Sequence, residues 1–140
     1  MRLEPAEARR RFAASPVLRL ATADADGRPH VVPCTFVVDE VGRVAIGIDN
    51  KPKSASSGLR RLRNIAANPH VSMVVDQYAD DWTQLWWARA EGLAKIEESG
   101  ASHAGYWDLL RGKYPQYAGQ ILDGPVIVTE VGSWTGWTFA

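Results

Sequence analysis

The fold is decided by residues 17–48, "VLRLATADADGRPHVVPCTFVVDEVGRVAIGI". Aliphatic residues dominate or alternate in three runs, which predicts strands at 17–24, 30–39 and 44–48. Short polar turns join the runs, and the first turn contains Gly27, which can adopt a positive φ. Because such short turns can join only antiparallel neighbours, the stretch predicts an antiparallel sheet rather than βαβ units.

The rest of the chain adds helices and further strands around this sheet. Pro33 lies inside the second predicted strand, which must therefore be an edge strand or carry a bulge. Helices are expected at about 5–15, 59–67 and 102–114, and strands at 70–79, 85–98 and 125–139, the last as one bent strand or a hairpin. The sequence thus predicts one mainly β domain over residues 1–140, an antiparallel sheet curled into a small barrel with about three helices outside.

Composition excludes several classes of function. The formal net charge of 0 argues against a nucleic-acid-binding protein. No apolar run is long enough for a membrane span, and the single Cys34 allows no intrachain disulfide, as is typical of cytoplasmic proteins. No metal-ligand spacing, nucleophile elbow or phosphate-binding glycine loop is present, so no metal is expected and no catalytic residue is identified.

Positive charge is concentrated in "IDNKPKSASSGLRRLRN", residues 48–64. No acidic residue follows Asp49 until Asp76, so the basic side chains lack an acidic partner nearby in the sequence. A helix beginning here would offer free N–H groups and a partial positive charge to an anion. The segment predicts a phosphate or carboxylate site, with a solvated helix face as the alternative. The basic residues are Lys51, Lys53, Arg60, Arg61 and Arg63.

Helical spacing assigns faces to this segment. Leu59, Leu62 and Ala66 would face the core, while Arg60 and Asn64 would face away from it.

The chain contains 6 tryptophans, of which Trp86 and Trp87 are adjacent in a predicted strand. Adjacent strand residues point to opposite faces, and a small barrel has room for one of the two rings. The other ring would face a helix, a partner or a ligand. Core packing is the alternative, but aromatic walls beside an anion site suit a planar cofactor with an anionic tail.

Three segments carry a resemblance over nearly the whole chain: "LATADADGRPHVVPCTFVVD", "IDNKPKSASSGLRRLRNIAANPHVSMVVD" and "DDWTQLWWARAEGLAKI". They resemble the flavin and deazaflavin split-barrel family within the pyridoxamine phosphate oxidase superfamily. More narrowly, they are similar to its actinobacterial branch, which uses the deazaflavin coenzyme F420. The resemblance implies a six-stranded split barrel that forms a homodimer, with a cofactor and a small-molecule substrate at the subunit interface.

The resemblance also implies roles for individual residues. The cofactor phosphate would be held by Lys51, Lys53, Arg61 and Asn64, with Arg60 nearby. The ring system would be lined by Pro33, Cys34, Thr35, Ile48 and Asp49. The second subunit would contribute Asp81, Trp82 and Trp86.

The function implied is a reductase that passes hydride from the reduced deazaflavin to a conjugated organic substrate. Two alternatives remain open: an FMN-binding oxidoreductase on the same fold, and a non-catalytic module that binds a flavin or haem. The proton donor is also open, with Tyr78 and Asp81 as candidates. The chain departs from the FMN-dependent oxidases, because "KPKSAS" lacks the arginine of their phosphate motif and "SWTGWTF" lacks the arginine of their substrate-phosphate pair.

Overall fold

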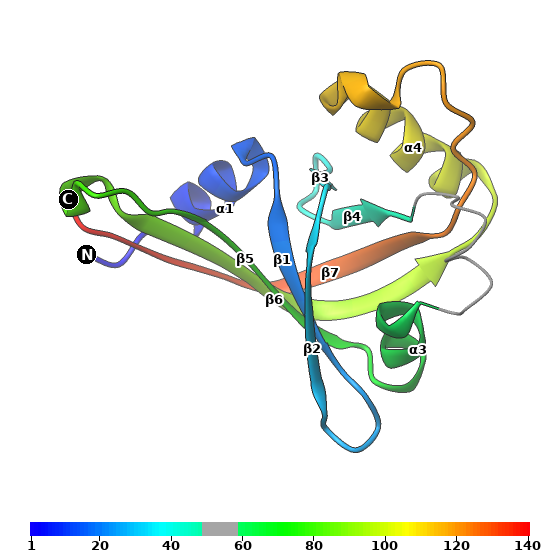
Figure 1. The fold of residues 1–140 in the computed structure, drawn as a ribbon, viewed down its shortest axis with the longest axis horizontal. Coiled ribbons are helices and arrows are strands. Elements are labelled where there is room, and N and C mark those ends of the chain that lie inside the picture. The colour runs from blue at the N-terminus through cyan, green and yellow to red at the C-terminus, as the bar shows by residue number, and fades with distance from the viewer. Residues whose placement is uncertain (49–58) are drawn as a thin grey trace.

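The computed structural model describes residues 1–48 and 59–140, which form a strongly curled antiparallel sheet with helices around it (Figure 1). The strands have the spatial order β2-β1-β5-β6-β7-β4-β3. Their bounds are β1 Leu18–Ala23, β2 Pro29–Cys34, β3 Val37–Val38, β4 Val44–Gly47, β5 His70–Gln77, β6 Trp86–Glu97 and β7 Val126–Thr138. The predicted mainly β, antiparallel split-barrel architecture is confirmed.

The two edge strands of the sheet follow each other directly in the sequence. Strands β2 and β3 are the edges, yet only Thr35 and Phe36 separate them in sequence. Two residues reach at most about 11 Å between the flanking Cα atoms, so the sheet must curl until its edges are adjacent. The expected strand at 30–39 divides here, which gives seven strands in place of six. Pro33 lies in the edge strand β2, as predicted.

Strands β6 and β7 form the long, bent spine of the sheet. They contain 12 and 13 residues and pair along almost their whole length. Their register shifts between Glu91 and Gly92, which is a β-bulge. A Cβ at Gly92 would overlap the Glu130 carbonyl oxygen, so the bend requires glycine there. The expected C-terminal strand is therefore a single bent strand rather than a hairpin.

Two helices close the barrel against solvent. Helix α1 (Pro5–Ala14) ends before Pro16, and its buried Phe12 contacts the rings of Phe36 and Trp134, each at a centroid distance of 5.2 Å. Helix α4 (Ala101–Lys113) covers the β4 side of the sheet. Its Trp107 packs over Gly47, and the Trp107 indole N–H donates to the Gly124 carbonyl at 2.9 Å.

Helix α3 (Arg60–Ala67) packs against β1 and β6, and Leu59 and Leu62 pack against the core as predicted. Asn64 and Ile65 are buried, whereas Ala66 is exposed. The prediction that Asn64 faces away from the core is wrong. Its side-chain amide donates to the Thr22 hydroxyl at 3.0 Å, which allows a polar side chain to be buried there.

The remaining short elements are the 3-10 turns η1 (Trp82–Gln84) and η2 (Pro115–Tyr117). Within the described ranges, no helix has the length and apolar character needed to cross a membrane. The same ranges contain no group of three or more histidine, cysteine or carboxylate side chains suited to a metal ion.

Candidate functional site

Helix α3 brings Arg61 close to Cys34 at the end of β2. The Arg61 Nε is buried and has no hydrogen-bond partner among the residues that the structure describes. Burial raises the pKa of the Cys34 thiol to about 11, and the nearby positive charge of Arg61 offsets only part of this rise. Cys34 therefore stays a neutral thiol at pH 7.

A second unpaired polar atom lies on the inward face of the same hairpin. His30, Val32 and Cys34 alternate with exposed residues along β2, and His30 pairs in register with Thr22 of β1. The Nδ1 of His30 is buried without a partner in the described part of the chain. The hairpin thus places His30 on the face that also holds Cys34. The sequence analysis missed His30, although its period-two spacing from Cys34 was a usable signal.

The basic residues of α3 do not form one cluster. Arg60 and Arg63 line a cavity of about 470 Å³ that also contains Asp24, Asp26 and Arg28 of the β1–β2 turn. The backbone N–H of Arg28 lowers the pKa of Asp24, and Arg60 contributes further to this lowering. Acidic partners that are distant in sequence are therefore close in space. Arg60 faces these carboxylates, and Arg61 is left as the arginine nearest the predicted ring site.

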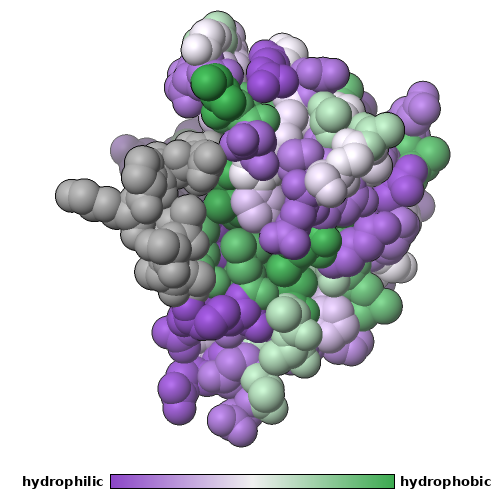
Figure 2. Space-filling view, turned by 90° about the vertical axis from the view of Figure 1, so that its right-hand side faces the viewer, coloured by the Kyte–Doolittle hydropathy of each residue, from purple (hydrophilic) through white to green (hydrophobic). Residues whose placement is uncertain are grey.

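The structure describes only some of the other residues that were predicted to contact the phosphate or the ring. Asp49, Lys51 and Lys53 lie outside the described residues, so their predicted contacts stay predictions. Ile48 is buried, and its backbone N–H donates to the Pro125 carbonyl at 2.8 Å, which fixes the chain just before the basic segment. Figure 2 shows the side of the molecule on which α3 and α4 lie. A hydrophobic area on this side is bordered by hydrophilic side chains.

Thr35 opens into a cavity of about 350 Å³ lined by Pro16, Val17, Tyr114, Gln116 and Tyr117. The hydroxyls of Thr35 and Tyr117 lie 2.7 Å apart, and either can donate. The Tyr114 hydroxyl donates to the Pro16 carbonyl at 2.8 Å and accepts from the Phe36 N–H at 3.0 Å. This cavity was not predicted, because the sequence showed Pro115 only as the end of a helix.

Asp81, Trp82 and Trp86 lie at the opposite end of the β5–β6 hairpin from α3. Asp81 caps η1 by accepting from the Thr83 N–H at 3.0 Å, and Trp82 is 70% exposed. Trp86 pairs with Gln77, at the far end of β5 from His70. In register, Pro33, the neighbour of Cys34, is level with Val74 of β5 through Arg19, three residues before Gln77.

A family model described as pyridoxamine 5'-phosphate oxidase matches residues 5–133. The chain belongs to this family. The predicted membership of the wider superfamily is therefore confirmed. The match covers every described helix and strand apart from the C-terminal end of β7.

Solved structures share the family fold with this member. A conserved hypothetical protein of Mycobacterium tuberculosis is 19% identical, with a TM-score of 0.74 over 98% of this chain and 86% of that one. A FAD-binding protein of Mesorhizobium loti is 19% identical, with a TM-score of 0.69 over 97% of this chain and 93% of that one. At these identities, the comparisons establish the fold alone.

One curated relative is closer in sequence over a shorter stretch. A 5a,11a-dehydrotetracycline/5a,11a-dehydrooxytetracycline reductase of Streptomyces rimosus is 45% identical over 58 residues, which is 41% of this chain. The match spans 38% of the length of that relative. Around the β2–β3 crossing, the site of this pyridoxamine 5'-phosphate oxidase family member combines a neutral thiol, a hydroxyl-lined cavity and an arginine whose Nε has no partner among the described residues.

Proposed function

We propose that this protein is an oxidoreductase that binds coenzyme F420 and transfers hydride between its deazaflavin ring and a conjugated organic substrate. The proposal rests on the environment of Arg61. Its buried Nε has no partner in the described residues, and its charged side chain lies near Cys34. A buried, unpaired donor on a charged side chain is costly unless a ligand completes it. A phosphate completes an arginine fork with strong, charge-assisted hydrogen bonds.

The family and the relatives support an oxidoreductase that uses a flavin-like cofactor. The chain belongs to a family described as an oxidase, and its curated relative is described as a reductase. The structural neighbour from Mesorhizobium loti is described as FAD-binding, which keeps FMN or FAD as the second candidate cofactor. The segment that contains Lys51 and Lys53 directly precedes α3 in sequence, so these lysines would add charge for the longer anionic tail of coenzyme F420.

When bound, the deazaflavin supplies or accepts the hydride. The residues of this chain would position the cofactor and the substrate and would supply the proton. Arg61 orients the phosphate, and Cys34, as a neutral thiol, adds no competing negative charge beside it. The Thr35–Tyr117 hydroxyl pair holds an exchangeable proton at the wall of the adjoining cavity.

The complete site would require two chains. The family resemblance assigns Asp81, Trp82 and Trp86 to a second copy of the chain, which would bring them to the cofactor held by Arg61. The outer face of the sheet offers a surface for this association, because Trp87 and Trp137 are register neighbours there and Val31 of the edge strand is 66% exposed. A homodimer would place two cofactors per assembly.

The test is a pair of titrations of the purified protein, one with coenzyme F420 and one with FMN, followed by fluorescence. We expect tighter binding of coenzyme F420 that weakens as salt increases. Arg61→Ala should weaken binding by about 1.5–3 kcal/mol, the range for a hydrogen bond to a charged group. Arg111→Ala, on the exposed side of α4, is the matched control and should leave affinity unchanged. Tighter binding of FMN would favour the second candidate, and failure to bind either ligand would overturn the proposal.

A further inference from the structure

The junction of α1 and β1 forms a second cavity next to the one at Thr35. It has a volume of about 460 Å³, within the usual range for small-molecule sites. Its lining consists of Arg10, Arg11, Ala14, Ser15, Pro16, Asp76, Gln77 and Trp86. Pro16 lines both cavities, so the two are neighbours, and the pair of cavities is named the groove beside α1.

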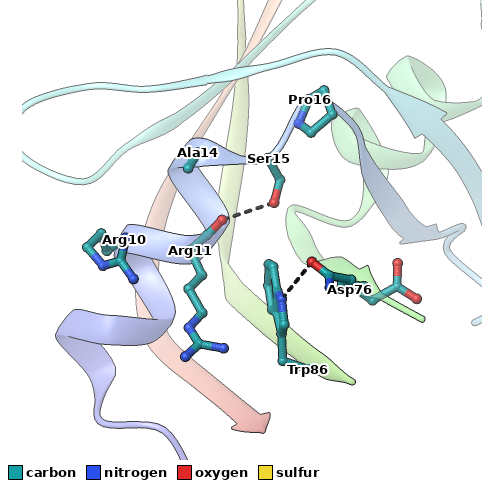
Figure 3. Close-up of a pocket in the computed structure, with 8 residues that line it drawn as sticks. Arg10, Arg11, Ala14, Ser15, Pro16, Asp76 and Trp86 are labelled. Carbon is teal, nitrogen blue, oxygen red and sulfur yellow. Dashed lines mark hydrogen bonds between the residues drawn. The ribbon is translucent and has the colours of Figure 1, made fainter. Parts of the chain in front are cut away.

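One wall of this cavity presents a guanidinium and an aromatic ring together (Figure 3). The Cζ of Arg11 lies 5.4 Å from the centroid of the Trp86 ring. The Arg11 Nε donates to Glu7 at 2.7 Å, and its side chain makes no other hydrogen bond with the residues that the structure describes. The Trp86 indole N–H donates to the Gln77 side-chain oxygen at 3.3 Å, which orients the ring. The terminal nitrogens of Arg11 therefore have donors available to a ligand.

The charges around the cavity favour an anion. Glu7 accepts hydrogen bonds from both Arg10 and Arg11, so this trio carries one net positive charge. Asp76 is the carboxylate in the lining, and Arg19 pairs with it at 3.2 Å. A carboxylate entering the cavity would meet Arg11 without facing an unpaired negative side chain.

The groove is held in shape by α4. The Lys113 ammonium donates to the carbonyls of Ala13 and Ser15 at 3.2 and 2.8 Å, and the Tyr114 hydroxyl donates to Pro16. The end of α1 and the segment that leads to β1 are thus fixed at Ala13, Ser15 and Pro16. A site that is already formed loses little ordering entropy when it binds a ligand.

We infer that this groove is the substrate site, and that its substrate is an elongated, planar, conjugated carboxylate. The inference rests on the proposed function and names the substrate class. The conjugated body would occupy the cavity with the Thr35–Tyr117 hydroxyl pair, and the carboxylate would pair with Arg11 beside Trp86.

The experiment measures binding of 3-(2-naphthyl)acrylate and of its neutral amide to the full-length protein, without any cofactor, by isothermal titration calorimetry. We expect the carboxylate to bind about tenfold or more tightly than the amide, as a charge-assisted arginine pair provides. Arg11→Gln should remove this preference. Trp86→Phe, which keeps an aromatic ring, should retain the preference for the carboxylate. Arg28→Gln, on the distant β1–β2 turn, is the matched control and should behave as the wild type.

Each outcome separates this inference from the proposed function. Equal binding of acid and amide, or an unchanged preference in Arg11→Gln, would overturn the assignment of the groove. Because the assay contains no cofactor, that result would not change the conclusion drawn from the cofactor titration. Conversely, loss of cofactor binding in Arg61→Ala with unchanged binding of the naphthyl acid is expected if the two sites are distinct. Loss of the acid preference in Arg61→Ala would also contradict the groove assignment.

Discussion

Replacing Tyr114 by phenylalanine tests how the crossing between the two sheet edges is held. The Tyr114 hydroxyl accepts from the buried Phe36 N–H at 3.0 Å and donates to the Pro16 carbonyl at 2.8 Å. It therefore joins the β2–β3 crossing to the segment that leads from α1 to β1. Tyr114→Phe keeps the ring and its packing but removes these two hydrogen bonds, together with the 3.0 Å contact between the hydroxyl and the Phe36 carbonyl.

The expected loss follows from these two groups. A buried N–H left without a partner costs about 1–3 kcal/mol, and the lost bond to Pro16 adds about 0.5–1.5 kcal/mol. We expect the free energy of unfolding to fall by about 2–4 kcal/mol, measured by urea denaturation with unchanged m-value. Tyr117→Phe is the matched control, since its hydroxyl bonds the half-buried Thr35 side chain, and it should cost less than about 1.5 kcal/mol. A loss below about 1 kcal/mol for Tyr114→Phe, or equal losses for both variants, would refute this reasoning.

Two further predictions concern packing and the thiol. Gly47→Ala should lower the free energy of unfolding by about 1–3 kcal/mol, because a Cβ there would come within 2.6 Å of the Trp107 Cζ3 and 2.9 Å of the Leu110 Cδ1. Gly105→Ala, in the same helix as Trp107 but with nothing near its Cβ, should instead stabilise by about 0.5–1 kcal/mol, so equal effects of both variants in urea would contradict the packing argument. Iodoacetamide at pH 8 should alkylate native Cys34 roughly a hundredfold more slowly than the urea-unfolded chain, because burial raises the thiol pKa to about 11. Equal rates in the two states, followed by mass spectrometry, would show that the thiol is accessible and ionised.

The order and type of the elements could be predicted from the sequence because they depend on local chemistry. Pro16 ends α1, and Gly27 and Gly42 adopt positive φ values of 82° and 96° in the turns of the first three predicted strands. Alternation of apolar residues identified the strands, and Pro33 correctly marked an edge. These signals act within a few residues and need no knowledge of distant partners.

The organisation of the site could not be predicted from the sequence, because it depends on contacts between distant segments. Asn64 is buried because Thr22 offers it a partner across 42 positions of sequence. Arg60 faces Asp24 for the same kind of reason, so the apparent lack of acidic partners in the sequence was misleading. The cavity at Thr35 requires Tyr114 and Tyr117 from the other end of the chain. Only the folded sheet brings these pairs together.

The bent strand β7 has a consequence for the order in which the molecule folds. It pairs with β4, where Ala45 opposes Val128, and it also contacts α1. These partners lie more than about 80 residues apart, so their pairing incurs a large loop-closure entropy before it gains stability. The β1–β2 hairpin can form early and locally, whereas the barrel and the groove beside α1 close only when β7 arrives. We therefore expect the pairing of β7, rather than formation of the hairpin that carries Cys34, to limit the rate of folding.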